Sequence, residues 1–249
     1  MTQVGVQLYS VREAMTADPG KALDRLAAIG YRMVEPTFGL LGGDPAGFRR
    51  LLDARGLTAC ALHGPALGPL LDQIADAALA IGADTVVVPA VPAGEFTTAA
   101  GITRVAHRLG DAAAVLGERG LRLAYHNHHF ELANRPEGRP ALELLAALLP
   151  PSVALELDVY WAAVGGVDVP ALLGRLGDRV RLLHVKDGPA TVDDPMTAVG
   201  AGTLPIPAIL AAAPPGARRI VEIDRCDGDM FDALDASFAF LSQTAAGVR

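Results

Sequence analysis

Short apolar runs rich in β-branched residues alternate along this chain with longer stretches in which apolar residues recur at helical spacing. The first pattern predicts buried strands and the second predicts amphipathic helices. The predicted strands cover residues 4–9, 31–35, 58–63, 84–89, 121–126, 153–158, 180–186 and 218–223. The predicted helices lie near residues 20–29, 45–55, 69–82, 102–119, 139–149, 168–176, 205–213 and 229–243. Several helices are followed by glycine just before the next strand, as in "AIGY" and "AIGAD", which is typical of a helix C-terminus.

The number of these strand–helix units determines the expected fold. Eight units in 249 residues predict an α/β protein of the (β/α)8 TIM barrel type. The competing architecture is a doubly wound open sheet, and the count of units disfavours it. No Ser/Pro-rich linker and no block of like charge marks a domain boundary, so we expect a single TIM-barrel domain over residues 1–249.

Composition then narrows the class of protein. The chain is 51% apolar and 20% charged, which is enough to build a core. No apolar run approaches the ~18 residues of a membrane-spanning helix, and a strand pattern begins at residue 4, so we expect neither a membrane segment nor a signal peptide. Cys60 and Cys226 show neither a metal-type spacing nor a disulfide framework.

These features indicate a cytoplasmic enzyme that acts on a small molecule. The formal net charge of −7 disfavours a nucleic-acid partner, which would normally need a basic face. A homo-oligomer stays compatible with the sequence.

The polar residues of the predicted strands lie mostly at their C-terminal ends, and the last four strands carry a distinctive set. These ends supply His126, Asp158, His184 with Lys186, and Glu222. Barrel enzymes carry their chemistry at this end of the strands. The convergence of these side chains at one side of the barrel mouth therefore predicts a metal-centred active site.

Side-chain alternation along each strand predicts which of these residues face the same side of the sheet. It places Glu156 one layer below Asp158, and it directs His126 and His128 to the same side. Carboxylates and imidazoles without thiolates form a hard site, which favours Mn²⁺, Mg²⁺ or Co²⁺ over structural Zn²⁺. Each residue alone has an ordinary explanation, such as a helix cap for Asp158 or a carboxylate partner for Lys186. Their recurrence on four successive strands favours the metal site.

Six motifs together resemble a known family. They are "VGVQLYSVRE", "YHNHHFEL", "LELDVYW", "HVKD", "VGAGTLP" and "VEIDRCDGD". In this order they resemble the sugar phosphate isomerase/epimerase family with the xylose isomerase-like barrel, and within it the subgroup with a "YHNH" motif. The resemblance covers almost the whole chain. It implies one divalent metal ion, Mn²⁺ first and Mg²⁺, Co²⁺ or Zn²⁺ as alternatives. It also implies a keto sugar, sugar phosphate, inosose or 3-keto-glycoside as substrate.

The resemblance also implies a set of metal ligands. Asp158, His184 and Glu222 match the family's ligand positions. For the fourth ligand we favour Glu131, because the "YHNH" subgroup has a glutamate five positions after the first histidine of that motif. His126 is the alternative, because it stands where many relatives have a glutamate.

The predicted reaction begins with proton abstraction next to a carbonyl group and passes through an enediolate. The catalytic acid–base residues are expected to be His126, His128, Lys186 and Glu222. The sugar-binding residues are expected to be Gln7, Tyr9, His63, Tyr160, Trp161 and Arg225. Epimerisation, isomerisation and elimination share this first step, and the sequence leaves all three open.

Two rival hypotheses belong to other classes of function. A metal-dependent endonuclease for abasic DNA shares this barrel, but it needs a further histidine soon after the strand-six aspartate, where this chain has Tyr160 and Trp161. A sugar-binding barrel without catalysis would predict a lost ligand, and none is evident.

Overall fold

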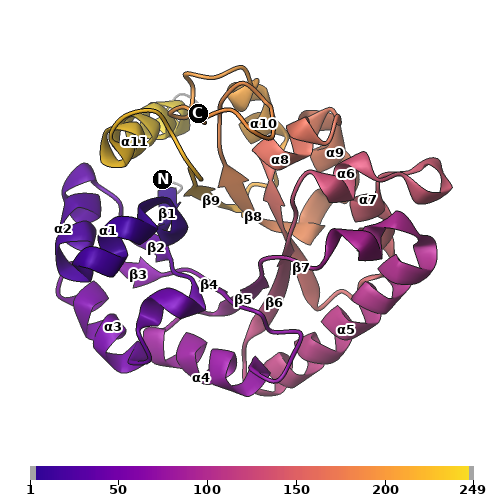
Figure 1. Cartoon of the computed structure of the whole chain (residues 1–249), viewed down its shortest axis with the longest axis horizontal. Helices are drawn as coiled ribbons and strands as arrows, with labels where there is room; N and C mark the ends of the chain where they lie inside the picture. Colours follow the sequence, from indigo (N-terminus) through magenta and orange to yellow (C-terminus); the bar gives the residue numbers. More distant parts are fainter. Residues whose placement is uncertain (1–3, 247–249) are drawn as a thin grey trace.

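The computed structural model describes residues 4–246 and shows a ring of parallel strands surrounded by helices (Figure 1). The strand order is β3-β2-β1-β9-β8-β7-β6-β5-β4, and each neighbouring pair is parallel. The strands are β1 (Val4–Gln7), β2 (Met33–Glu35), β3 (Thr58–Ala59), β4 (Leu62–His63), β5 (Thr85–Val88), β6 (Arg122–His126), β7 (Val153–Asp158), β8 (Val180–Val185) and β9 (Arg218–Val221). The predicted TIM barrel is confirmed.

The structure has nine strands because the predicted strand 58–63 is divided into β3 and β4. The first piece pairs with β2 and the second with β5. Between the pieces, Cys60 N donates to Val34 O at 2.9 Å, and at the end of β4 His63 N donates to Pro36 O at 3.0 Å. This single segment therefore joins the two edges of the sheet and nearly closes the barrel.

Eleven α-helices occur in the described part of the chain. They are α1 (Arg12–Ala17), α2 (Pro19–Ile29), α3 (Pro45–Asp53), α4 (Leu71–Ile81), α5 (Ala99–Glu118), α6 (Phe130–Ala133), α7 (Ala141–Leu148), α8 (Val159–Val164), α9 (Val169–Leu176), α10 (Ile206–Ala212) and α11 (Met230–Ala246). Eight of them match the predicted helices. The short helices α1, α6 and α8 were not predicted, and they follow β1, β6 and β7 at the C-terminal side of the barrel. No helix within residues 4–246 is both long and apolar enough to cross a bilayer.

The barrel interior has an apolar floor. It consists of Met33, Cys60, Ala61, Val87, Ala124, Leu182 and Ile220, all buried. Four of these stand two positions before Glu35, His126, His184 and Glu222 on their strands, so side-chain alternation stacks a polar layer directly above the floor. The strands therefore keep water from the lower side of the polar layer and leave it accessible only from the C-terminal mouth.

Candidate active site

Four side chains from neighbouring strands form what we call the outer group. It consists of His126, Asp158, His184 and Glu222, and one ligating atom of each lies within 4.8 Å of the others. All four residues are buried. The first three end or lie in β6, β7 and β8, and Glu222 directly follows β9. The predicted convergence of these four residues is present in the structure.

A second set, which we call the inner group, overlaps the first. It consists of His63, His126, Glu156 and His184, again within 4.8 Å of one another. Glu35 joins it from β2, with its Oε2 atom 2.6 Å from His184 Nε2 and 3.3 Å from His63 Nε2. Glu35 and Glu156, the inner carboxylates, are fully buried. The sequence pattern indicated the layer of Glu156 but gave no role to Glu35, because one carboxylate ending a strand is common.

The shared imidazoles connect the two groups through opposite ring nitrogens. His126 directs Nδ1 to Glu156 Oε2 at 3.1 Å, and its Nε2 lies 4.0 Å from Asp158 Oδ2. His184 directs Nε2 to Glu35 Oε2 at 2.6 Å, and its Nδ1 lies 2.7 Å from Glu222 Oε2. A metal-binding histidine commonly donates its other ring N–H to a carboxylate. The inner carboxylates therefore orient both rings so that one nitrogen of each is directed into the outer group.

The pKa values of the two imidazoles differ. Burial lowers the pKa of His126 to about 3, so this ring is neutral, as a metal ligand must be. Burial would also lower the pKa of His184, but Glu156, Glu222 and Glu35 outweigh it and hold that pKa well above its usual value. A metal ion at Nδ1 of His184 would take the place of a proton.

Carboxylates outnumber cations in the two groups. Glu35, Glu156, Asp158 and Glu222 are buried there. The cations that face them are Lys186, His184 and His63, and the inner carboxylates overcome the burial of His63 and raise its pKa to about 10. Buried charges require compensation, and a divalent ion in the outer group would reduce the excess of negative charge.

The two carboxylate oxygens of Asp158 have different partners. Its Oδ1 accepts from Trp161 N at 2.8 Å and caps α8. Its Oδ2 makes no hydrogen bond within the described structure and lies 3.0 Å from Lys186 Nζ. Burial raises the pKa of Asp158 to about 6. Within the outer group, Lys186 is therefore the partner of this oxygen, and the residue types of the group fit a divalent ion.

Lys186 forms the centre of a carboxylate cluster at the pocket wall. Its Nζ lies 2.6 Å from Glu222 Oε2 and 2.9 Å from Asp224 Oδ2, besides its contact with Asp158. Burial would lower the pKa of Lys186, but these three carboxylates hold it well above its usual value. Lys186 is therefore held in its charged form beside the outer group.

Two buried side chains that sequence reasoning missed hold the loops of the site. Asn127 Oδ1 accepts from Asp158 N at 3.0 Å, which ties the end of β6 to the end of β7. Asp187 accepts from four backbone amides of residues 188–204, at Gly188, Gly200, Gly202 and Leu204. A Cβ atom on Gly202 would lie 2.1 Å from Asp187 Oδ1, so this loop requires glycine there. The "HVKD" and "VGAGTLP" motifs are thus two halves of one loop anchor.

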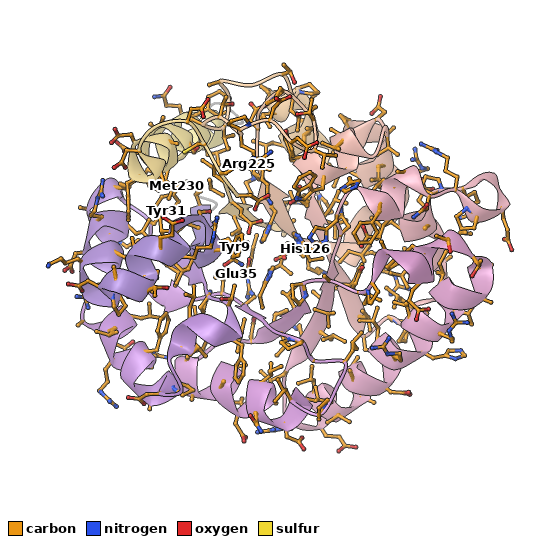
Figure 2. All side chains as sticks on the ribbon, viewed as in Figure 1. Tyr9, Tyr31, Glu35, His126, Arg225 and Met230 are labelled. Atoms are coloured by element: carbon orange, nitrogen blue, oxygen red, sulfur yellow. The ribbon has the colours of Figure 1, made fainter. Side chains whose placement is uncertain are left out.

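A pocket of about 670 Å³ opens above the outer group. Its wall includes seven of the predicted site residues, namely Tyr9, His63, His126, His128, Trp161, Lys186 and Glu222. Figure 2 shows His126 directed into the ring of strands, with Tyr9 and Glu35 across from it. Burial and the nearby Lys186 lower the pKa of His128 to about 4, so its ring is neutral at pH 7.

Three predicted sugar-binding residues lie outside the pocket wall. Gln7 is fully buried below it, where its amide donates to Glu35 Oε2 at 3.0 Å. Tyr160 is also buried, and its hydroxyl is bonded to the backbone of Thr191. Arg225 is exposed, and its guanidinium group donates to Val192 O at 3.4 Å. Strand direction explains the misplacement of Tyr160, because α8 begins at once after β7 and turns this ring away.

Glu131, the favoured fourth ligand, belongs to neither group. It lies on α6, with Oε1 accepting from the Tyr125 hydroxyl at 2.5 Å and Oε2 accepting from His128 N at 2.9 Å. Burial raises the pKa of Glu131 to about 7. The structure thus brings His126, the alternative, to the outer group, and gives Glu131 a place in bracing the loop that carries His128.

Comparisons with known proteins agree with this architecture. The sequence model of the xylose isomerase-like TIM barrel family matches residues 23–223. A sugar phosphate isomerase/epimerase from Parabacteroides distasonis has a similar structure, with 23% identity, a TM-score of 0.80, and coverage of 99% of this chain and 94% of that one.

Two further similar structures have other activities in their names. One is a probable 3-DHS dehydratase from Bacillus anthracis, with 12% identity, a TM-score of 0.75, and coverage of 96% and 98% of the two chains. The other is an L-ribulose 3-epimerase, with 13% identity, a TM-score of 0.71, and coverage of 99% and 95%. Comparison with curated proteins gave no match. At these identities the likeness shows the fold.

Proposed function

Because the chain belongs to the xylose isomerase-like TIM barrel family, we propose that it is a divalent-metal-dependent sugar isomerase or epimerase. Its substrate is a keto sugar or a derivative of one, and its first step is removal of a proton from the carbon next to the carbonyl group. The observation that carries this proposal is the outer group: two imidazoles and two carboxylates of four adjacent strand ends converge beneath an open pocket.

The proposed ligands are His126, Asp158, His184 and Glu222, with His126 in place of Glu131. His126 presents a neutral ring nitrogen to the group, whereas both oxygens of Glu131 are already bonded. When bound, the ion supplies Lewis-acid stabilisation of negative charge on a carbonyl oxygen. Mn²⁺ is the first choice, because the ligand set mixes nitrogen with oxygen and contains no thiolate.

Proton transfer is assigned to groups of this chain that line the pocket. Burial would raise the pKa of Glu222, but Lys186 and His184 hold it well below its usual range, so Glu222 is an unprotonated acceptor at neutral pH. His128 is a second acceptor, since its Nδ1 makes no hydrogen bond within the described structure. Acceptors at two positions allow one to remove the α-proton and the other to return it.

Elimination is the second candidate reaction. Lys186 is held charged next to Glu222, so an acid and a base lie side by side at the wall of the pocket. A substrate with a leaving oxygen one carbon beyond the acidic carbon would receive a proton on that oxygen from Lys186. The products then distinguish the reactions, because elimination gives an unsaturated ketone.

The test is exchange of the α-hydrogen in deuterated water, followed by NMR across a panel of keto sugars with Mn²⁺ added. We expect exchange by the wild-type protein and a decrease of about 10²-fold or more in Glu222→Gln, the usual scale for loss of an acid–base group. Glu143→Gln, a glutamate bonded to Arg175 on the outer surface, is the matched control. An undiminished turnover of a substrate that lacks any α-hydrogen would refute the proposal.

A further inference from the structure

The pocket above the outer group has two chemically different sides. The polar side comes from β6 to β9 and includes His126, His128, Lys186, Glu222 and Asp224. The opposite side comes from the segments after β2, β4 and β5. It includes Phe38, Pro65, Pro89 and Ala90, which we call the apolar wall. Tyr9 follows β1, which lies between β9 and β2 in the strand order, whereas Trp161 follows β7 and belongs to the polar side.

The apolar wall has little to offer a polar ligand. Among the lining residues of these three segments, side-chain hydrogen bonding comes from Thr37 and His63. His63 is already directed to the inner carboxylates, with Nε2 2.7 Å from Glu156 Oε2. Sugar hydroxyls placed against Phe38, Pro65 and Pro89 would therefore lose hydrogen bonds to water without replacement, at a cost.

The pocket also lacks a free positive charge. Lys186 and His63 are the cationic side chains among its lining residues, and each faces two or more carboxylates. Phosphate groups are usually bound by arginine, lysine or several backbone amides. The lining therefore offers a phosphate no lysine or arginine that is free of a carboxylate partner.

The size of the pocket points in the same direction. A volume of about 670 Å³ lies in the range of ~300–1,000 Å³ that holds drug-sized ligands. A single sugar ring is smaller than such a ligand. If the ring occupies the polar side, the space before the apolar wall remains for another part of the same molecule.

We propose that the substrate is an uncharged glycoside whose apolar substituent lies against Phe38, Pro65 and Pro89, and that it is not a sugar phosphate. This inference rests on the proposed function, because it assumes that the sugar ring lies over the outer group. Phe38 is the residue that sets this specificity. It begins the 3-10 helix Phe38–Leu41 after β2 and is partly exposed at the pocket.

The test compares three probes: phenyl β-D-glucopyranoside, methyl β-D-glucopyranoside and glucose 6-phosphate. Binding to the Mn²⁺-loaded protein is followed by the fluorescence of Trp161, the single tryptophan of the chain and a residue of the pocket wall. We expect the phenyl glycoside to bind at least about tenfold more tightly than the methyl glycoside, because its ring removes apolar surface from water. Glucose 6-phosphate should bind no more tightly than the methyl glycoside.

Two variants locate the effect. Phe38→Ala should reduce the advantage of the phenyl glycoside to about threefold or less and leave the methyl glycoside unchanged. Leu40→Ala changes the same 3-10 helix at a residue outside the pocket wall, and it should keep the full advantage. A general disturbance of this segment would affect both variants.

The outcomes separate the inference from the proposed function. Equal binding of the two glycosides, or tightest binding of glucose 6-phosphate, would overturn the inference and leave a sugar enzyme in place. Retention of the phenyl advantage in Phe38→Ala would also overturn it. If none of the three sugars binds, the inference is overturned, and the deuterium exchange of keto sugars decides the proposed function separately.

Discussion

The inner and outer groups share two histidines and the same spacing of ligating atoms, yet they differ in access and in bonding. Glu35 and Glu156, the inner carboxylates, are fully buried and absent from the pocket wall, and they accept from neighbouring side chains. Glu156 Oε2 lies 2.7 Å from His63 Nε2 and 3.1 Å from His126 Nδ1. The outer group borders the pocket, and Asp158 Oδ2 makes no hydrogen bond. Proximity of ligating atoms therefore does not by itself identify a metal site.

This difference suggests that the inner and outer groups have different roles. The outer group is suited to hold an ion that a substrate can reach, and the inner group is suited to fix the rings that hold it. Glu35 and Glu156 each have one oxygen, Oε1, that makes no hydrogen bond in the described structure, so the inner group could also offer a ligand. Substitutions in each group can distinguish which of the two holds the ion.

The largest effect is expected from Asp158→Asn. Asparagine can still cap α8, because its side-chain oxygen can accept from Trp161 N, but it removes the negative charge of a ligand. We expect one Mn²⁺ per chain in the wild-type protein and none retained in the variant, with affinity lowered by more than about 100-fold. Elemental analysis and Mn²⁺ titration monitored by electron paramagnetic resonance measure this. Asp224→Asn removes another carboxylate next to Lys186 but outside the group, so it should keep the ion.

A smaller effect on the metal is expected from Glu156→Gln. The loss of an outer partner of a metal-binding histidine typically lowers metal affinity by about 10–100-fold. The stoichiometry should stay at one ion per chain. In the metal-free variant, ¹⁵N NMR of the histidine rings should show a changed tautomer balance at His126, whose Nδ1 faces Glu156.

The results for Asp158→Asn and Glu156→Gln together decide which group holds the ion. If Glu156→Gln releases the ion completely and Asp158→Asn retains it, the inner group is the metal site and our assignment is reversed. Glu143→Gln, on the outer surface, is the control for loss of a carboxylate as such and should leave both readouts unchanged.

Glu131 gives a pH-dependent effect on stability rather than on metal binding. Burial raises its pKa from the ordinary value of 4.5 to about 7, so the fold favours its protonated form. The stabilisation is fully present below pH 4.5 and is lost as the pH rises through 7. Relative to the wild type, Glu131→Gln should therefore gain stability between pH 5 and pH 8, by up to about 3 kcal/mol.

Unfolding in urea at the two pH values, without metal, measures this change. Glu143→Gln again serves as the control for loss of a carboxylate away from the site. If Glu131→Gln instead lowers Mn²⁺ affinity as strongly as Asp158→Asn, Glu131 is a ligand after all.

The sequence predicted the barrel and the converging strand ends because both depend on patterns that repeat every two residues or every turn of helix. Asp158, His184 and Glu222 end apolar runs, so their common location followed from parallel strands. The choice between His126 and Glu131 depended instead on the path of the loop after β6. That path is set by Asn127 and the short helix α6, which have no periodic pattern.

Glu35 shows a second limit of sequence reasoning. Its value to the site comes from His184, a residue 149 positions away that approaches it across the barrel interior. Strand order alone does not say which side chains meet across a closed barrel, since that depends on tilt and stagger. The inner carboxylates were therefore visible as polar residues but not as partners of the imidazole rings of the outer group.

The smallest effect is expected at Tyr160, which the sequence placed in the sugar pocket and which the structure places behind it. Its hydroxyl donates to Thr191 O at 2.9 Å and accepts from Thr191 N at 3.1 Å, so it fastens the loop after β8. Tyr160→Phe should lower the free energy of unfolding by about 1 kcal/mol, the usual worth of such bonds, and should change the affinity for methyl β-D-glucopyranoside less than twofold. Tyr9→Ala, at the pocket wall, is the contrasting variant, and it should weaken binding of that sugar with little effect on unfolding. If Tyr160→Phe instead binds the sugar more weakly and its stability is unchanged, Tyr160 contributes to sugar binding. The loop after β8 would then reach over the sugar in the bound state.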